Sequence, residues 1–433
     1  MQTKNLQEIL DKLEISQLNA MQQEAYKTIG ENPNTILLSP TGSGKTLAFL
    51  LPLLEILDPD LAEVQALILV PSRELAIQIE QVTREMGAGF KANAVYGGRA
   101  FSKDKIELQH APAILIGTPG RIADHFRRRT FATKNIKALV LDEFDKSLEV
   151  GFENEMKEII AELSGLQKRI LTSATQNIDV PGFVGLKNPK RIDYLKGEQP
   201  SIEIKTINVL PKNKLQSLVN LLSENEKGSG IIFCNLKDSI AEVSDFLNRN
   251  NIEHGIFSGG MEQKDRERSL IKFRNGSHRI LIATDLAARG IDVPEIDFII
   301  HYQLPYKASE FTHRNGRTAR MHQEGIAYVL SDRKTLPDFI NSNNYKIQES
   351  KPDTEVVEKT TLFISGGRKD KISKGDIAGL FLKQGNLKKE ELGLIELKQD
   401  CAFVAVPEKK ADALIEALNN TKLKKKKVRV RYV

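Results

Sequence analysis

The chain has little cysteine and no long apolar run. Its 433 residues include two cysteines, Cys234 and Cys401, so a disulfide framework and a CxxC metal pattern are both excluded. No stretch approaches the roughly 18 consecutive apolar residues of a transmembrane helix, which argues against a membrane protein. The first residues, Met1–Leu6, lack the apolar core of a signal peptide. We therefore expect a cytoplasmic protein in a reducing compartment.

The composition is otherwise ordinary for a folded protein, but its charge is uneven. Apolar residues make up 40% and charged residues 28% of the chain, which is enough for full hydrophobic cores. At roughly 150 residues per domain, the length predicts about three domains. Residues 351–433 hold 19 basic and 12 acidic side chains. Such an excess is often only a solvated terminus, but it also suits a polyanionic partner.

A phosphate-binding loop is the strongest single motif. Residues 39–46 read Ser-Pro-Thr-Gly-Ser-Gly-Lys-Thr, between a short apolar run typical of a buried strand and one typical of a helix. In such a loop the backbone N–H groups face a polyphosphate, Lys45 neutralises its oxygens, and the Thr46 hydroxyl coordinates Mg²⁺. We expect further nucleotide contacts from Thr41, Gly42, Ser43 and Gly44. The alternative is a chance Gly/Ser turn before Lys-Thr.

Strand-like and helical runs alternate around this loop. Apolar strands are predicted at 35–38, 66–70, 92–96, 113–116, 138–141 and 169–172. Continuous apolar strands between helices indicate a parallel sheet that is covered on both faces. In such sheets ligands bind at the carboxyl ends of the strands.

Two carboxylates directly follow the strand at 138–141. Asp142 at a strand end beside a phosphate loop is typical of the residue that holds Mg²⁺. The adjacent Glu143 is placed to orient and deprotonate an attacking water. The alternative is an acidic turn that caps the next helix.

A second α/β array follows a polar connector near 196–204. Its strands are predicted at 230–233, 253–257, 279–283, 298–301 and 326–329, and it has no phosphate loop. Arg317 and Arg320 are three residues apart, so on a helix they would share one face and suit the charge that develops on a γ-phosphate. A structural or RNA-phosphate role is the alternative. We expect a cleft between the two arrays that closes around ATP.

Together these motifs make the chain similar to the DEAD-box ATP-dependent RNA helicases of superfamily 2 over residues 1–350. The segments that carry the resemblance are 39–46, 71–76, 118–121, 142–145 (with Phe144 in place of alanine), 173–175, 284–292 and 313–320. The resemblance implies two tandem RecA-like parallel-sheet domains, an ATP-binding domain at 1–195 and a C-terminal helicase domain at 205–350. It also implies RNA-stimulated ATP hydrolysis with ATP and Mg²⁺ as cofactors.

The resemblance also assigns roles to single residues. Gln22 would bind the adenine edge and Asp292 the ribose, and the catalytic set would be Lys45, Asp142, Glu143, Arg317 and Arg320, with Mg²⁺ held by Thr46 and Asp142. Coupling between ATP and RNA would involve Asp145, Ser173, Thr175 and His313. RNA backbone contacts would involve Arg73, Gly98, Thr118, Arg121, Gln263, Arg266 and Thr284.

Besides Phe144, two further positions depart from the family pattern. The family's adenine-stacking aromatic falls near Asn5–Leu6, so we expect weak stacking or another residue in that role. Gln303 replaces an acidic residue, and the sequence assigns no consequence to that change.

The C-terminal part reads as a small separate domain. After a polar linker at 349–354, the β-α-β-β-α-β order over 357–433 predicts an α+β fold like an RNA-recognition motif. Phe363 and Phe403 lie where such sheets stack bases, although both are equally well explained as core residues. Residues 364–371 resemble the C-terminal domain of DbpA-type bacterial helicases, which implies anchoring on large-subunit ribosomal RNA.

These observations predict an ATP-dependent helicase that remodels structured RNA, with ribosomal RNA in ribosome assembly as its target. We expect a monomer that associates with pre-ribosomal particles. The alternatives are a non-processive ATP-gated RNA clamp or chaperone, a cold-response or mRNA-decay helicase, and a DNA helicase. Gln22 and the basic tail disfavour the last of these.

Overall fold

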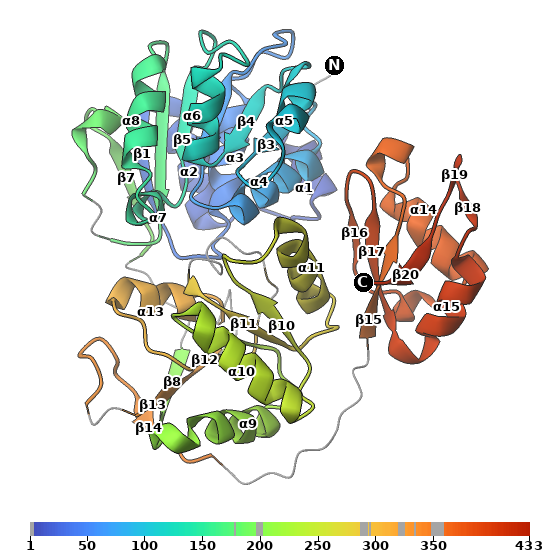
Figure 1. The fold of residues 1–433 in the computed structure, drawn as a ribbon. Helices are drawn as coiled ribbons and strands as arrows, with labels where there is room; N and C mark the ends of the chain where they lie inside the picture. Colours follow the sequence, from blue (N-terminus) through green and yellow to red (C-terminus); the bar gives the residue numbers. More distant parts are fainter. Residues whose placement is uncertain are drawn as a thin grey trace. The chain divides into compact units, whose positions relative to one another are not determined.

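The fold is described from a computed structural model that covers residues 4–176, 179–195, 202–285, 293, 296–318, 325–332, 335–347 and 359–433. It contains two seven-stranded parallel sheets and a smaller four-stranded antiparallel sheet (Figure 1). The predicted class, α/β with a small α+β domain at the C-terminal side, is confirmed.

The first sheet has the strand order β3-β4-β2-β5-β6-β1-β7, and every pairing in it is parallel. Its strands are β1 (Asn34–Leu38), β2 (Ala66–Leu69), β3 (Ala92–Val95), β4 (Ile114–Gly117), β5 (Ala138–Leu141), β6 (Lys168–Ser173) and β7 (Lys190–Asp193). The central strands are apolar at nearly every position because both faces of the sheet are buried.

Helices cover the two faces of the first sheet. Residues of α1 (Leu6–Lys12), α2 (Ala20–Glu31), α3 (Lys45–Leu54) and α4 (Arg73–Met86) pack in one hydrophobic core. Residues of α5 (Phe101–Leu108), α6 (Pro119–Arg127), α7 (Phe144–Glu149) and α8 (Glu153–Glu162) pack in the other. Successive residues of β2 alternate between these cores, Ile68 to the first and Leu69 to the second.

The second sheet repeats this plan with the order β10-β11-β9-β12-β13-β8-β14. Its strands are β8 (Ile202–Asn208), β9 (Gly230–Phe233), β10 (His254–Phe257), β11 (Ile280–Ala283), β12 (Phe298–His301), β13 (Gly325–Ser331) and β14 (Asn343–Asn344), and its helices include α9 (Lys214–Glu224), α10 (Lys237–Arg249), α11 (Gln263–Arg274) and α13 (Ala308–Asn315). Strand β8 begins at Ile202, inside the stretch 196–204 that we expected to be a connector. It pairs along its whole length with β13.

The third sheet has the order β16-β17-β15-β20, with antiparallel pairings throughout. Its elements are β15 (Lys359–Ile364), α14 (Lys374–Gly379), β16 (Ile395–Leu397), β17 (Ala402–Pro407), α15 (Ala411–Leu418) and β20 (Val430–Tyr432), and the short hairpin β18 (Lys422–Leu423) and β19 (Lys426–Lys427) precedes β20.

The two phenylalanines of this sheet lie on the face away from the apolar core of the domain. Leu362 and Val404 belong to that core. Phe363 and Phe403, one position along, are paired across β15 and β17 with ring centroids 5.7 Å apart. Phe403 is nevertheless buried by its neighbours, so stacking of bases on these rings stays a prediction.

Within the described residues, no helix combines the length and apolarity that a membrane-spanning segment requires. Cys234 is buried and Cys401 is half-buried, and both are free thiols.

Candidate nucleotide and RNA sites

The order of the first sheet sorts the predicted site residues into two groups. Strands β5, β6 and β1 are neighbours, and their carboxyl ends carry Asp142, Ser173 and the phosphate loop. Strands β3, β4 and β2 are also neighbours, and their carboxyl ends lead to Gly98, Thr118 and Arg73. Because all strands are parallel, both groups lie along one edge of the sheet.

The phosphate loop forms the sharp turn that its glycines permit. Gly42 and Gly44 have φ of +82° and +88°, in the left-handed region that side chains disfavour. Helix α3 begins at Lys45, so the free N–H groups of its first turn face the loop. The Lys45 ammonium donates to the Ser39 and Pro40 carbonyl oxygens, both at 2.6 Å, which holds the cation over the loop.

The Gln22 side chain is hydrogen-bonded to the backbone of this loop. Its side-chain Oε1 accepts from the Asn19 N–H at 3.0 Å in a capping box at the start of α2, and its Nε2 donates to the Gly44 carbonyl at 3.3 Å. The Asn19 side chain donates to the Ser43 carbonyl at 3.1 Å. A Cβ at Gly44 would lie 2.4 Å from Gln22 Nε2. The sequence suggested only an adenine contact for Gln22, whereas the structure ties it to the loop backbone.

Asp142 is buried, with 4% of its surface exposed. It accepts hydrogen bonds from the Thr172 hydroxyl and, at 3.0 Å, from the Glu143 N–H. Burial raises the pKa of the Asp142 carboxyl, while the Thr172 hydroxyl and the Lys45 charge act to lower it. Thr172 was not among the predicted site residues, and its place beside Ser173 in the sequence is the one signal that pointed to it.

Glu143 has an unusual backbone conformation for a glutamate. Its φ of +46° and ψ of +49° place it in the left-handed region, at the residue before α7. Such a conformation costs about 1–3 kcal/mol and is concentrated at functional sites. The next residue, Phe144, is fully buried in the core of the second face. The departure from alanine at this position is thus absorbed by packing behind the carboxylates.

Ser173 and Thr175 connect β6 to the loop. The Ser173 carbonyl accepts from the Ser39 N–H at 3.1 Å. The Ser173 hydroxyl lies 3.0 Å from that of Thr175 and accepts from the Thr175 N–H at 2.9 Å. These bonds join the start of the phosphate loop to a segment predicted to couple ATP with RNA.

The second group in this domain consists of Arg73, Gly98, Thr118 and Arg121. Arg73 is the first residue of α4, and a Cβ at Gly98 (φ +89°) would lie 2.4 Å from its Nη1. Only glycine fits there without a shift of the arginine. Thr118 precedes α6, and Arg121 lies in the first turn of that helix. Four predicted residues from three separate segments of the chain therefore come together at three neighbouring strand ends.

The second domain places its predicted residues in the same way. Gln263 and Arg266 lie on α11, which follows β10, and Thr284 follows the neighbouring strand β11. The Arg266 guanidinium lies 4.7 Å from the centre of the Phe257 ring. His313 is on α13, which follows β12.

The predicted shared helix face of Arg317 and Arg320 is wrong for Arg317. Helix α13 ends at Asn315, with Gly316 as its C-cap. Beyond it the chain turns, because the N–H groups of Arg317 and Thr318 donate to the Arg314 and Asn315 carbonyl oxygens at 3.1 Å. Thr318 then forms a parallel bridge with Ile296, and its hydroxyl donates to the Ile296 carbonyl at 2.6 Å. Arg320 and the predicted ribose ligand Asp292 lie outside the described residues.

An ion pair around Arg314 was not predicted. Arg314 is 2% exposed and makes a two-point ion pair with the Asp285 carboxylate, with Nε at 2.6 Å from Oδ1 and Nη2 at 2.5 Å from Oδ2. It also donates to the Gln303 carbonyl at 2.6 Å and to the Asn235 side chain at 2.8 Å. The arginine therefore joins the ends of β9, β11 and β12.

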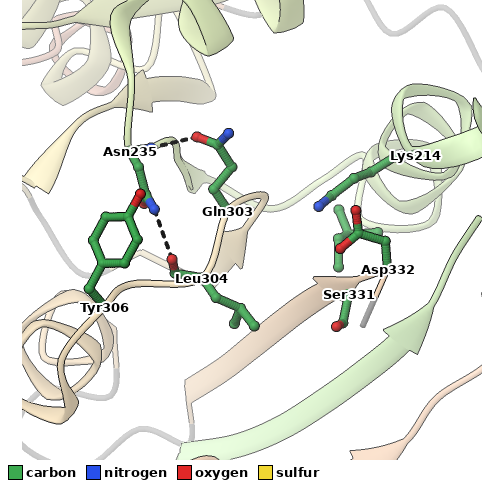
Figure 2. A pocket seen from close by; sticks show the side chains of 8 residues that line it. Lys214, Asn235, Gln303, Leu304, Tyr306, Ser331 and Asp332 are labelled. Atoms are coloured by element: carbon green, nitrogen blue, oxygen red, sulfur yellow. Dashed lines mark hydrogen bonds between the residues drawn. The ribbon is translucent and has the colours of Figure 1, made fainter. Parts of the chain in front are cut away.

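The side chain of Gln303 bonds to Asn235 and Ser239 rather than to Arg314. Its Oε1 accepts from the Asn235 N–H at 2.7 Å, as Figure 2 shows, and its Nε2 donates to the Ser239 hydroxyl at 2.9 Å. With an amide at this position, Asp285 is the one carboxylate that bonds to Arg314 within the described residues. Asn235 and Gln303 also line a polar cavity of about 220 Å³, together with Lys214, Leu304, Tyr306, Leu330, Ser331 and Asp332 (Figure 2).

His301 makes the second domain sensitive to acid. Its Nε2 faces Asn315 Oδ1 at 2.8 Å, and its Nδ1 faces Arg314 Nη1 at 3.5 Å. Because arginine only donates, the neutral ring accepts at Nδ1. Burial, and then the Arg314 charge, lower the pKa of His301 from 6.5 to about 3.

Acidification from pH 7 to pH 5 is therefore expected to lower the free energy of unfolding of this domain by about 2 kcal/mol through His301. The unfolded chain takes up a proton below pH 6.5, which the folded domain does not until about pH 3. The stabilisation is thus present above pH 6.5 and lost as the pH falls through this window. Urea unfolding at the two pH values measures the effect, and the variant His301→Gln should show a weaker pH dependence. Equal pH dependence in both proteins would contradict this assignment.

Three family models match successive parts of the chain. They are described as the DEAD/DEAH box helicase (residues 19–181), the helicase conserved C-terminal domain (213–322) and the DbpA RNA binding domain (361–432). Each match falls on one of the three sheets.

Relatives match the chain over nearly its whole length. The ATP-dependent RNA helicase DbpA of Bacillus subtilis is 31% identical, with 97% of this chain and 96% of the relative covered. The protein of the same name from Escherichia coli is 32% identical, with 98% and 96% covered.

Solved structures match the two helicase sheets. S. cerevisiae Dbp5 bound to RNA and ADP BeF3 has a TM-score of 0.69 at 28% identity, over 76% of this chain and 88% of that one. Mss116p bound to ssRNA and AMP-PNP has a TM-score of 0.66 at 25% identity, over 75% and 71%.

The fold, the phosphate loop with its carboxylates and these matches show that the chain belongs to the DEAD-box family of ATP-dependent RNA helicases. Its two parallel sheets are RecA-like domains, and it is an ATP hydrolase that binds RNA. Within the family it is similar to the bacterial DbpA helicases, whose RNA-binding domain it carries.

Proposed function

We propose that the enzyme couples RNA-stimulated ATP hydrolysis to local unwinding of structured RNA, with ribosomal RNA in ribosome assembly as the target. It acts as a cytoplasmic monomer on pre-ribosomal particles. Its proposed domains are residues 1–195, 205–350 and 357–433, and strand β8 extends the second of them back to Ile202. The observation that carries the proposal is the group at β5, β6 and β1, where a strained Glu143 follows a buried Asp142 beside the phosphate loop.

In this proposal the residues of the loop hold ATP and Glu143 accepts the proton of the attacking water. Thr46 and Asp142 would hold Mg²⁺, which when bound neutralises charge on the phosphates. Hydroxyl and carboxylate oxygens suit this hard cation. Among the described residues no cluster of three or more His, Cys, Asp or Glu side chains forms a metal site. That agrees with Mg²⁺, which usually takes one or two carboxylates and completes its shell with water and phosphate oxygens.

The remaining predicted residues have supporting roles. Gln22 and Asp292 would contact adenine and ribose, and Arg317 and Arg320 would stabilise charge on the transferred phosphate. Coupling is proposed for Asp145, Ser173, Thr175 and His313. The RNA backbone would be contacted by Arg73, Gly98, Thr118, Arg121, Gln263, Arg266 and Thr284.

ATP hydrolysis by the full chain tests the proposal. It is measured without nucleic acid, with generic single-stranded RNA, with total ribosomal RNA and with DNA. Stimulation by ribosomal RNA well above that by other RNA supports a targeted ribosome-assembly enzyme. Equal stimulation by every RNA would overturn the ribosomal target, and no stimulation by any RNA would overturn the coupling itself.

The basic hairpin β18–β19 is proposed to anchor RNA. Lys424 and Lys426 are engaged within the domain, because they pair with Asp376 at 3.0 Å and Asp370 at 2.7 Å. The intervening and flanking lysines, Lys422, Lys425 and Lys427, are exposed. They are therefore the better candidates for phosphate contacts.

Replacing these three lysines by glutamine is expected to weaken binding of structured RNA. The salt dependence of binding should also fall, by about 0.7–0.9 in log–log slope for each RNA phosphate that a lysine no longer neutralises. ATP hydrolysis without RNA should stay unchanged. The matched control replaces three exposed lysines of the first domain, Lys137, Lys187 and Lys190. Equally weakened binding in both triple variants would mean that the hairpin contributes only general charge.

A further inference from the structure

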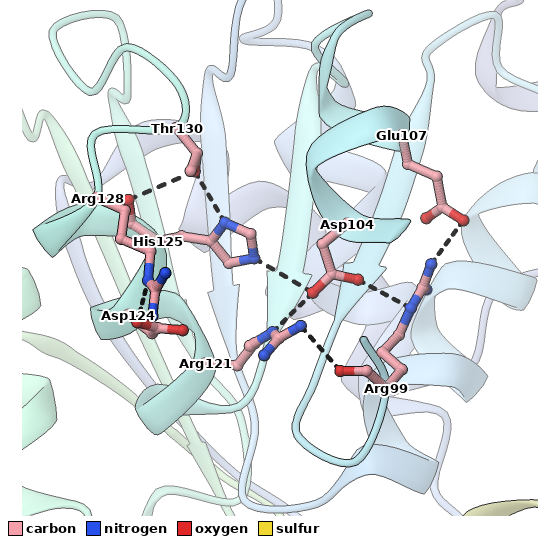
Figure 3. Close-up of polar contacts among 8 residues, drawn as sticks. All are labelled: Arg99, Asp104, Glu107, Arg121, Asp124, His125, Arg128 and Thr130. Atoms are coloured by element: carbon pink, nitrogen blue, oxygen red, sulfur yellow. Dashed lines mark hydrogen bonds and ion pairs between the residues drawn. The ribbon is translucent and has the colours of Figure 1, made fainter. Parts of the chain in front are cut away.

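A buried carboxylate lies behind the RNA group of the first domain. Asp104, on α5, is fully buried. Its Oδ1 pairs with Arg99 Nε at 2.8 Å, and its Oδ2 pairs with Arg121 Nε at 2.7 Å. The ring of His125, also fully buried, lies 3.3 Å from Oδ2 (Figure 3). One carboxylate thus faces three nitrogen-bearing side chains.

The contacts around Arg121 fix the plane of its guanidinium. Besides the Asp104 bond, its Nη2 donates to the Arg99 carbonyl at 3.1 Å (Figure 3). The guanidinium carbon of Arg121, Cζ, lies 4.9 Å from the centre of the Phe101 ring. Within the described residues Nη1 makes no hydrogen bond, and 12% of the side chain is exposed. A guanidinium held in this way loses little freedom when Nη1 meets a phosphate.

The same carboxylate links two segments predicted to meet RNA. Arg99 directly follows Gly98 in the loop between β3 and α5, and Arg121 lies in the first turn of α6 after β4. Strands β3 and β4 are neighbours. The position of the β3–α5 loop relative to the start of α6 therefore depends on Asp104.

Other acidic side chains of the cluster do not make this link. Glu107 pairs with Arg99 at 2.7 Å, and Asp124 pairs with Arg128 at 2.7 Å. Both are partly exposed, and within the described part of the chain neither pairs with Arg121. Asp104 is the one acidic side chain there that pairs with both Arg99 and Arg121, and it acts beside the direct bond from Arg121 Nη2 to the Arg99 carbonyl.

We propose that Asp104 is a positioning residue for RNA binding, which holds Arg121 and the β3–α5 loop in the arrangement that an RNA sugar–phosphate backbone meets. This inference rests on the proposed function. Asp104 touches neither RNA nor ATP and acts through Arg121.

The test measures RNA-stimulated ATP hydrolysis of full-length variants. Asp104→Asn should raise the RNA concentration for half-maximal stimulation about tenfold, as expected when one oriented phosphate contact is removed. Turnover at saturating RNA and the KM for ATP should stay unchanged. The matched control is Glu158→Gln. Glu158, on α8, forms a surface ion pair with Arg127, which lies on α6 as Arg121 does. An unchanged RNA requirement in Asp104→Asn, or the same increase in the control, overturns the proposal.

Two further variants separate positioning from folding. In the double variant Asp104→Asn with Arg121→Gln, the RNA requirement should equal that of Arg121→Gln alone, whereas additive effects would show that Asp104 does not act through Arg121. Arg121→Lys keeps the positive charge but cannot bond to both Asp104 and the Arg99 carbonyl as the guanidinium does. It should therefore also raise the RNA requirement several-fold. If Asp104→Asn fails to fold, Arg121→Lys decides, and wild-type behaviour of that variant overturns the proposal. A wild-type enzyme that RNA does not stimulate would instead refute the proposed function.

Discussion

An enzyme with glutamine in place of Glu143 is expected to hydrolyse ATP about 10²–10⁴-fold more slowly, as is typical when a general base is removed. The left-handed backbone and the bonds from its N–H to Asp142 Oδ1 at 3.0 Å and to Thr172 Oγ1 at 3.3 Å hold the residue in place. Glutamine keeps this shape but does not accept a proton. Phosphate release at saturating ATP and RNA measures the change.

Binding of RNA in the presence of ATP should survive in Glu143→Gln, because the strand ends that carry the RNA group are untouched. The control is Glu153→Gln, which removes an exposed acid paired with Lys157 on α8 and should leave turnover unchanged. Turnover near the wild-type rate in Glu143→Gln would refute the assigned chemistry.

Asp285→Asn is expected to destabilise the second domain by about 3–5 kcal/mol, because it leaves the buried Arg314 cation without its carboxylate. Arg314 is 2% exposed. Gln303 offers it only a backbone carbonyl. The midpoint of urea unfolding, followed by a probe in this domain, measures the destabilisation.

The control for this variant is Asp265→Asn. Asp265 pairs with Arg268 at 3.8 Å on the exposed face of α11, and such surface pairs contribute about 0–1 kcal/mol. A destabilisation by Asp285→Asn as small as the control's would mean that the Arg314 charge is solvated or neutralised by other groups. Replacing both Asp285 and Arg314 by apolar residues should cost less than Asp285→Asn alone.

Local sequence patterns were enough to predict the two parallel sheets and the phosphate loop. Apolar strands alternate with amphipathic helices, and small residues before Lys45 are typical of one kind of turn. Sheet order was not predictable from these patterns. It is the order that places Arg73, Gly98 and Thr118 side by side, because pairing between distant strands depends on packing across the whole domain.

Side-chain contacts between distant segments were beyond the sequence. Asp104 reads as an ordinary helical acid, and nothing nearby in the chain indicates that Arg121 lies against it. The end of α13 before Arg317 was missed because residue spacing alone does not show where a helix stops, although Gly316 is a common stop signal. The sequence showed only an excess of basic side chains over residues 351–433. The hairpin there divides it into lysines that pair with Asp370 and Asp376 and lysines that face solvent.

The separation of the two residue groups along one sheet edge has a consequence for how variants behave. Four strand spacings separate β4 from β1, which at about 4.8 Å each is roughly 19 Å. The two groups adjoin where β2 pairs with β5, but ATP held at the end of β1 and RNA held at the end of β4 would contact different side chains. Defects in nucleotide use and defects in RNA use should therefore be genetically separable, and a single substitution that impairs both would identify a residue that transmits the state of one ligand to the other.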